Sequence, residues 1–447
     1  MNEQNRLDDD SAGGAWLRAA RALDPTLRVA RTVALLGLYE RFACCAAECG
    51  CRSVEATWRA APDRLGRVGM RAWPIAPGQP GRAAARARRA LERGDPVVAA
   101  RDGGEGLLAR EEGIWFVLEH AAPVPGEERL TSAELGASRA FVVRRSRAAR
   151  GRPRATALVA VAEWAVWALS SPVPAICQSA GPALCSTGAA GLEAWASAAR
   201  GLAAFGPAEH ARAQVLVGGL LAVRAFLGER AGAGRTPPTL RMRRAADALG
   251  DCVELVEAAR AQPGTAAPAL RMAAAGLTRA AGHAAEGALM GMGLPPEVRS
   301  ALLEEPATEL RNVALHDTVY LARAAVAPVR RLAARRLAGC ARPLAVSTLA
   351  ELLFAADVAT AETALWAITR HDLEVAWPVL AGAARRLPRS ARAAERSVVP
   401  SVLWWLAELD EARAEPLLRE VAAASGERAS RVRDWAARLL RGRSAGG

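Results

Sequence analysis

The sequence predicts a mostly α-helical protein with a small α/β domain near its amino terminus and a helical solenoid near its carboxyl end. Alanine, leucine and arginine, which favour helices, are abundant, whereas aromatic residues make up only 4% of the chain. Short β-rich runs bounded by Gly, Pro and Asp are confined to residues 67–145. Near the carboxyl end, the motif Val-Arg-x-x-Ala-Ala-x-x-Leu occurs twice.

The two copies of this motif begin at Val329 and Val432, 103 residues apart, which is close to three periods of a ~34-residue paired-helix repeat. Each copy spaces its apolar residues as one face of a helix does. Two more helices are expected over 358–369 and 399–409. Residues 326–441 therefore resemble HEAT-type (PBS-lyase-like) helical repeats. That resemblance implies stacked helices and a surface for a protein or peptide partner.

The chain has 447 residues and a formal charge of +13, and all 59 of its basic residues are arginine. Its length suggests two or three domains at about 100–200 residues each. Lysine also binds phosphate well, so the complete use of arginine indicates a compositional bias rather than a phosphate-binding patch. We therefore do not expect a nucleic-acid partner, and we keep an arginine-lined nucleic-acid-binding repeat protein as the second alternative.

Residues 1–27 are expected to form a tail that is disordered over 1–14 and helical from about Ala15, and they contain no secretory signal. The longest apolar run, 155–169, has Glu163 at its centre and is shorter than the ~20 residues that span a bilayer. Eight cysteines without a regular framework are typical of a reducing compartment. We expect a cytoplasmic protein without a membrane partner.

Residues 28–146 are expected to form the small α/β domain. Helices are predicted over 29–47 and 81–93, and strands over 70–75, 97–99, 114–118 and 141–143. The arginine-rich stretch 144–154 is interpreted as a solvated linker.

Residues 155–325 are expected to form a helical middle domain, because Gly and Pro divide an otherwise helical pattern. The predicted helices span 155–170, 187–204, 207–231, 238–262, 266–292, 297–304 and 307–325. Residues 171–188, which carry Pro and Cys, are predicted to form a loop.

The densest group of reactive side chains is Cys44, Cys45, Cys49 and Cys51. A zinc site draws ligands from separated segments, and no second Cys or His pair follows nearby. Free cysteines are often buried. We expect core thiols here, with a reactive thiol and a metal site as alternatives, and we expect no cofactor.

The order of a Cys-bearing helix, a strand, the sequence Ala-Leu-Glu-Arg-Gly-Asp-Pro-Val-Val-Ala at 90–99 and a strand from Trp115 resembles two related domains. These are the papain-like domain of bacteriocin-processing cysteine peptidases and the amino-terminal domain of butirosin-type acyl-transfer proteins. The resemblance implies Cys45 as nucleophile and His120 as base. Here, however, His120 ends its strand, and Cys45 lies late in its predicted helix, away from the helix-terminus field that lowers a thiol pKa. We interpret the domain as degenerate and non-catalytic.

Two groups of side chains near the carboxyl end are candidates for partner binding. Trp404 and Trp405 point about 100° apart on a helix, so one is expected in the core and the other at its edge. The arginines could line a phosphate-binding face, but we favour a solvated outer face. They are Arg330, Arg331, Arg335 and Arg336, followed by Arg385, Arg386 and Arg389.

The expected function is a non-enzymatic scaffold that binds a protein or peptide partner through its helical repeats. A cysteine-dependent acyltransferase or peptidase that uses Cys45 is the first alternative. On the last predicted helix, Trp435 and Leu439 are expected to be buried.

Overall fold

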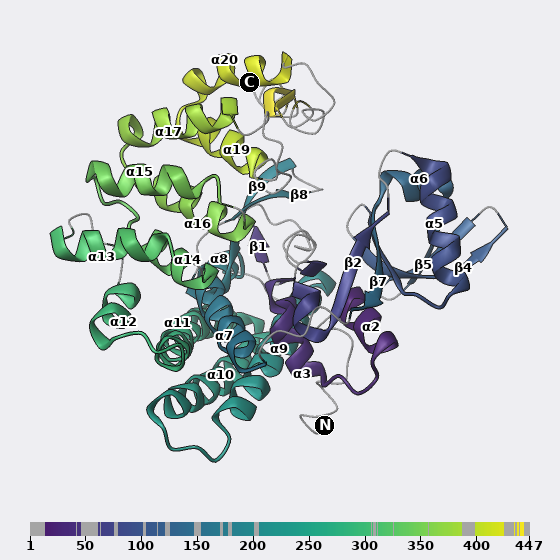
Figure 1. The fold of residues 1–447 in the computed structure, drawn as a ribbon, viewed down its shortest axis with the longest axis horizontal. Helices are drawn as coiled ribbons and strands as arrows, with labels where there is room; N and C mark the ends of the chain where they lie inside the picture. The colour runs from purple at the N-terminus through teal and green to yellow at the C-terminus, as the bar shows by residue number, and fades with distance from the viewer. Residues whose placement is uncertain are drawn as a thin grey trace. The chain divides into compact units, whose positions relative to one another are not determined.

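The structure is a computed structural model. It describes residues 14–41, 43–45, 61–62, 64–75, 79–101, 104–113, 115–120, 126–146, 153–169, 173–177, 181–200, 205–304, 306, 310, 312–324, 326–355, 357–386, 398–423, 433, 436–437 and 439–441. As predicted, it is mostly helical with a small sheet domain near the amino terminus (Figure 1). The chain forms two compact units, Met1–Leu169 with Thr187–Met292, and Ser170–Ser186 with Gly293–Gly447. The predicted α/β domain and most of the predicted middle domain thus share the first unit.

A six-stranded antiparallel sheet belongs to the first unit. Its strands are β2 (Met70–Pro74), β3 (Val97–Arg101), β4 (Gly104–Glu112), β5 (Trp115–His120), β6 (Gly126–Thr131) and β7 (Arg139–Arg145), in the order β2-β7-β3-β4-β5-β6. The four predicted strands are confirmed as β2, β3, β5 and β7. Strands β4 and β6 were not predicted, because their charged residues interrupt the alternation of apolar and polar residues that indicates a strand. In the sheet these charges pair between strands, as Arg110 does with Glu127 at 3.2 Å.

Helices pack on both faces of this sheet. On one face, α5 (Pro80–Glu92) and α6 (Ser132–Ala137) bury small side chains such as Ala87 in a core with Val142. Neighbouring residues of a strand point to opposite faces, so Phe141 faces the other side. There it meets Trp16 of α2 (Gly14–Leu23), with 5.7 Å between the ring centroids. Residues 14–23 are therefore packed against the sheet and are not part of a free tail.

The helices predicted over 155–292 are confirmed, although their ends differ by some residues. They are α7 (Pro153–Leu169), α8 (Gly188–Ala198), α9 (Pro207–Ala231), α10 (Pro237–Ala261) and α11 (Ala266–Gly291). Within the described chain, Glu209–Ala231 is the one stretch long and apolar enough to cross a membrane. This stretch of α9 is packed against α10, and 61% of its most apolar window is buried, as in the core helix of a globular domain.

The helix predicted over 29–47 is wrong over the described residues 37–41 and 43–45; residues 42, 46 and 47 lie outside the description. α3 (Val29–Leu36) ends at Gly37, which has a φ of 71°, and the Arg64 side chain occupies the space that a Cβ would need. The chain continues as a short 3-10 helix, η2 (Leu38–Arg41), and a strand, β1 (Ala43–Cys45). α3 packs against α7 and α9, so the predicted boundary at residue 28 does not separate the sheet domain from the helices.

Glu163, the charged residue at the centre of the apolar helix α7, is buried because it is paired. Both of its carboxylate oxygens accept hydrogen bonds of 2.6 Å from Arg67, and the Nε of Arg64 lies 3.3 Å away. The two arginines also donate to the carbonyls of Leu35 and Leu36 at the end of α3. This buried cluster ties α3, α7 and the 3-10 helix η3 (Leu65–Val68) together.

The second unit contains a β-hairpin where a loop was predicted over 171–188. Its strands are β8 (Val173–Cys177) and β9 (Gly181–Thr187). The loop prediction is wrong because each strand contains a proline, which lacks an N–H group and reads as a turn signal. In the register of the hairpin, Pro174 is opposite Leu184 and Pro182 is opposite Ile176.

The remainder of the second unit is built from paired helices. They are α12 (Pro296–Leu303), α13 (Asn312–Ala322), α14 (Ala327–Arg336), α15 (Pro343–Leu352), α16 (Val358–Ile368), α17 (Leu373–Arg386), α19 (Val399–Leu409) and α20 (Glu411–Ala423). α13 packs on α14 and α15 on α16, while α14 also packs on α16 and α13 on α15. We call helices α13 to α20 the helical stack.

The repeated motif forms buried helix faces, as predicted. In its first copy, Val329, Ala333 and Leu337 are all buried in or directly after α14. In the second copy Ala436 is buried, and Leu439 beside the motif is buried as expected. Trp435 lies outside the described residues.

Candidate functional site

Cys45 and His120 do not lie on the elements that the papain-like resemblance implies. Cys45 ends strand β1, whereas the nucleophile of those families opens a helix. His120 ends β5 of the six-stranded sheet, and β1 is not a strand of that sheet. Both side chains, like those of Cys44, Cys49 and Cys51, lie outside the described residues.

Other metal-binding or nucleophilic groups are scattered. Among the described residues, no three or more His, Cys, Asp or Glu side chains come together as metal ligands. Cys252 and Cys340 are buried free thiols, and burial raises the pKa of Cys252 to about 12. Buried thiols of this kind behave as small apolar side chains. The buried His371 has no hydrogen-bond partner among the described residues at either ring nitrogen.

The arginines of α14 are largely buried, so the predicted solvated outer face is wrong for this helix. Arg385 and Arg386 are exposed as predicted, and Arg389 lies outside the described residues. Arg331, Arg335 and Arg336 expose 7%, 8% and 7% of their surface. Arg330 is partly buried, and its guanidinium lies 2.6 Å from the carboxylate of Asp357 at the start of α16. These side chains connect neighbouring helices, and a phosphate could reach Arg330 only in competition with its carboxylate partner.

Trp404 and Trp405 are placed as the sequence predicts. Their rings meet edge to face on α19, with 4.9 Å between the centroids. Trp404 is buried and Trp405 is partly exposed, which confirms one core residue and one at its edge. Of the two, only Trp405 offers surface to a partner.

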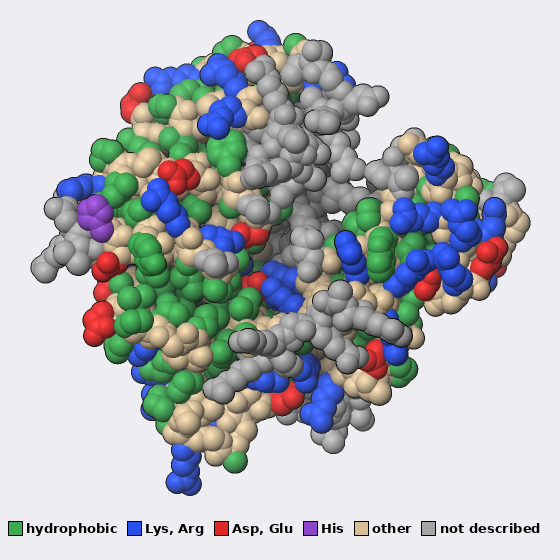
Figure 2. Space-filling model, viewed as in Figure 1, with side chains coloured by type: hydrophobic (Ala, Val, Ile, Leu, Met, Phe, Trp, Pro, Cys, Tyr) green, Lys and Arg blue, Asp and Glu red, His purple; other side chains and the backbone are tan. Residues whose placement is uncertain are grey.

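Charges of both signs are dispersed over the helical stack. Figure 2 shows blue and red side chains scattered between apolar ones on the face seen there. Many of these charges are paired between helices, as Arg413 of α20 is with Glu374 of α17 at 3.0 Å. This interleaving is the pattern expected from a compositional bias, and it differs from the single-sign stripe of a nucleic-acid footprint.

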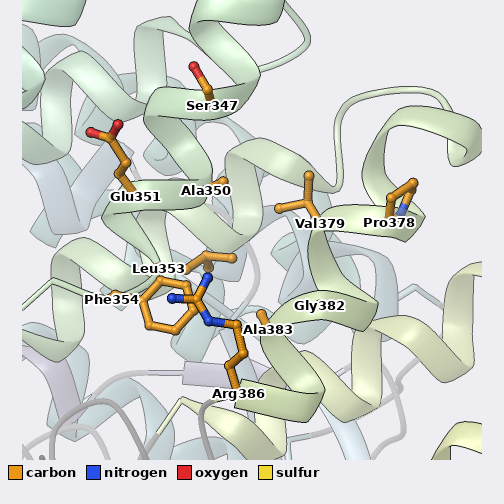
Figure 3. Close-up of a pocket in the computed structure, with 10 residues that line it drawn as sticks. All are labelled: Ser347, Ala350, Glu351, Leu353, Phe354, Pro378, Val379, Gly382, Ala383 and Arg386. Atoms are coloured by element: carbon orange, nitrogen blue, oxygen red, sulfur yellow. The ribbon is translucent and has the colours of Figure 1, made fainter.

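A groove with a volume of about 590 Å³ lies between α15 and α17 (Figure 3). This volume falls within the range of about 300–1,000 Å³ that is usual for binding pockets. The groove is lined by Ser347, Ala350, Glu351, Leu353, Phe354, Pro378, Val379, Gly382, Ala383 and Arg386. All of these residues belong to the second unit.

One wall of the groove comes from α15 and the turn that follows it. Ser347, Glu351 and Phe354 recur at the spacing i, i+4, i+7, which places them on one side of the helix. Leu353 is fully buried below them. The carboxylate of Glu351 is held from outside by Arg323, at 2.9 Å. This wall is therefore partly apolar, and its acidic charge is already balanced.

The other wall is a stripe of α17 in which Pro378, Gly382 and Arg386 recur every four residues. Pro378 lies inside the helix, where a proline costs about 3 kcal/mol relative to alanine. A glycine within a helix costs about 1 kcal/mol. Nevertheless, nothing lies within 4 Å of a Cβ built on Gly382, so packing does not require glycine there. What its missing side chain provides is space in the groove.

At one end of the groove, Arg386 lies over the ring of Phe354 (Figure 3). The guanidinium carbon is 4.5 Å from the ring centroid, a cation–π contact. Arg386 is exposed and Phe354 is partly buried. The site thus combines an apolar floor with a cation of fixed position, an arrangement that can hold an apolar side chain and an anionic group together.

Arg386 belongs to the row of arginines predicted from the sequence, whereas neither the groove nor Phe354 was predicted. The signal in the sequence is the pair Pro378 and Gly382, two poor helix formers spaced by one helical turn within a helical segment. The wall formed by α15 gives no comparable signal in the sequence. Phe354 follows the end of that helix, and its apolar side chain would be expected in the core.

No protein-family model matches the chain, and no curated protein matches it. The HEAT-type and papain-like resemblances therefore remain predictions.

Proposed function

We propose that this protein is a non-enzymatic scaffold that binds a peptide segment of a partner protein in the groove between α15 and α17. The observation that carries the proposal is the groove itself, with its apolar floor, its room above Gly382 and Arg386 fixed on Phe354. In this proposal the stack acts as a HEAT-like repeat surface, and the sheet domain acts as a docking or pseudoenzyme module.

The shape of the groove favours a peptide over a large folded surface. It is a space of about 590 Å³ between two helix walls, which is room for a few side chains. Helical repeats commonly present such sites on rigid helices, so little ordering is needed on binding.

The chemistry of the lining residues favours binding over covalent catalysis. Among the ten described lining residues, the one hydroxyl belongs to Ser347, and it donates a hydrogen bond to the carbonyl of Leu344. None of the ten lining residues is a histidine that could activate it. The buried free thiols Cys252 and Cys340 agree with a reducing compartment, and we propose a cytoplasmic location.

The proposal can be tested by selecting 12-residue peptides from a random phage-displayed library on the full chain. The selection is repeated on Gly382→Trp, which fills the groove, and on Gly282→Trp as a matched control. Both glycines lie within helices, and beyond the backbone of its own helix no atom lies within 4 Å of a Cβ built on either.

We expect peptides with a shared motif that bind the native chain and Gly282→Trp equally and that lose binding to Gly382→Trp. Peptides that bind all three proteins alike would contradict the proposal, as would a library that yields no enriched motif.

A further inference from the structure

We infer that the partner segment carries a carboxylate next to a large apolar side chain, and that Arg386 determines this specificity by binding the carboxylate. The inference rests on the proposed function, because it assigns the chemistry of the segment that the groove would hold. The ligand class is an acidic-apolar peptide segment.

The contact between Arg386 and Phe354 orients the guanidinium without using its hydrogen-bond donors. A guanidinium has five N–H donors that point outward in its own plane. The face of an aromatic ring attracts the positive charge but offers no acceptor to those donors. At 4.5 Å from the ring centroid, Arg386 is therefore held in place while two parallel N–H groups remain available for a carboxylate.

Neighbouring arginines of the stack have carboxylate partners. Arg323 pairs with Glu351 at 2.9 Å, and Arg385 pairs with Glu420 at 3.1 Å. Within the part of the chain that the structure describes, no carboxylate pairs with Arg386, and its guanidinium lies over the Phe354 ring. Since Arg323 balances Glu351, the groove carries one net positive charge. A ligand with a single carboxylate neutralises it.

The apolar part of the groove strengthens this preference. Val379 and Ala383 line the same groove as Arg386, and they suit an aliphatic or aromatic side chain of the ligand. When such a side chain enters, it displaces water from around the guanidinium, and electrostatic attraction increases at lower local dielectric. An apolar residue and a carboxylate close together in one segment therefore bind more tightly than either alone.

The apolar lining of the groove favours a carboxylate over a phosphate group. A phosphorylated side chain carries a charge of about −1.5 to −2. Removing this larger charge from water to an apolar groove costs more free energy than removing the single charge of Asp or Glu. Asp or Glu, with a charge of −1, is the better match. The net charge of the whole chain, +13, attracts acidic segments at long range but does not select among them.

The test uses pools of nine-residue synthetic peptides with Leu fixed at the centre. In each pool one further position is fixed as Glu, Gln, Lys or phosphoserine, and the others are random. Binding to the full chain is measured by fluorescence anisotropy at physiological salt. For the best position, we expect Glu peptides to bind about tenfold more tightly than Gln peptides, as a charge-assisted bidentate contact implies.

Variants of Arg386 and its neighbour assign the effect to one side chain. In Arg386→Gln the preference for Glu over Gln peptides should disappear, and in Arg386→Glu it should change to a preference for Lys peptides. Arg385→Gln is the matched control, because it removes the same charge one position away, outside the groove lining. It should keep the full preference. Both arginines are exposed, so the variants are expected to fold.

The outcomes separate this inference from the proposed function. If no pool distinguishes the native chain from Gly382→Trp, both are wrong. If binding depends on the groove but Glu and Gln peptides bind equally, or Arg386→Gln keeps the preference, only the specificity inference is overturned. Tighter binding of phosphoserine pools would overturn it in favour of a phosphopeptide partner.

Discussion

Replacing Glu163 by glutamine is expected to destabilise the first unit by about 3 kcal/mol. The substitution keeps the shape of the side chain and removes only its charge. Arg67 and Arg64 would then lose the carboxylate that they share, although both are largely buried, with side chains 19% and 8% exposed.

The magnitude follows from what remains after the change. Removing one partner of a buried ion pair typically costs about 3–5 kcal/mol, because the other charge stays buried without compensation. The carbonyl oxygen of glutamine can still accept a hydrogen bond from an arginine. Its NH2 group, however, is a donor and would face a second arginine N–H, which is also a donor. The arginines keep their contacts with the carbonyls of Leu35 and Leu36, at 3.1 Å and 3.4 Å. These retained contacts place the estimate at the lower end, about 3 kcal/mol.

The assay is thermal unfolding followed by tryptophan fluorescence, combined with hydrogen exchange to locate the change. For a unit of this size, about 3 kcal/mol corresponds to a fall in Tm of about 6–12 °C. Amide exchange should accelerate in α3 and α7. The matched control is Glu415→Gln, which breaks an exposed pair with Arg419 on α20 and should cost less than about 0.5 kcal/mol.

A result in which Glu163→Gln and Glu415→Gln shift the Tm equally would refute this reasoning, because it would show that the buried cluster does not hold α3 to α7. A triple change of Arg64, Arg67 and Glu163 to methionine provides a further check. It removes all three charges together and should recover much of the loss, since replacing a buried ion cluster by apolar residues is often close to neutral.

Three further predictions concern the second unit and the cysteines. Burial lowers the pKa of His371, although Asp372 opposes this. Because the unfolded chain then binds a proton more readily than the folded chain, the free energy of unfolding should be full above about pH 6.5 and fall below it. Urea unfolding measured across pH should show this dependence in the native chain and not in His371→Leu. Gly382→Ala should raise the unfolding free energy by about 1 kcal/mol, since helix α17 gains alanine without a clash. Iodoacetamide at neutral pH should leave Cys45 and Cys252 of the native chain unmodified by mass spectrometry; rapid labelling of Cys45 would support the acyltransferase alternative.

Most helices could be predicted because local signals define them. Proline lies at or next to the start of α9, α10, α12 and α15, and the apolar spacing between such starts is regular. Strands β4 and β6 could not be predicted from their charged residues, because the carboxylate that pairs with Arg110 lies on another strand. Local patterns do not contain this information.

The burial of the α14 arginines and the groove are harder to predict for a similar reason. A charged residue such as Arg330 is usually exposed. In the fold, however, Asp357 lies 27 residues later in the chain and accepts a hydrogen bond from it. Phe354 and Arg386 become neighbours only because α17 passes α15. Pairings at this separation depend on how helices stack, which one sequence does not determine.

The central claim is that the groove between α15 and α17 holds a peptide segment, and site-specific photo-crosslinking tests it most directly. Benzoylphenylalanine is placed at Ser347 on the groove rim and, as a control, at the exposed Ser197 on α8. Each protein is irradiated with a peptide selected on the full chain. We predict crosslinking from position 347 only, with loss of the product when Gly382→Trp is added. Crosslinking from position 197 alone, or equal yields from both positions, would contradict the account.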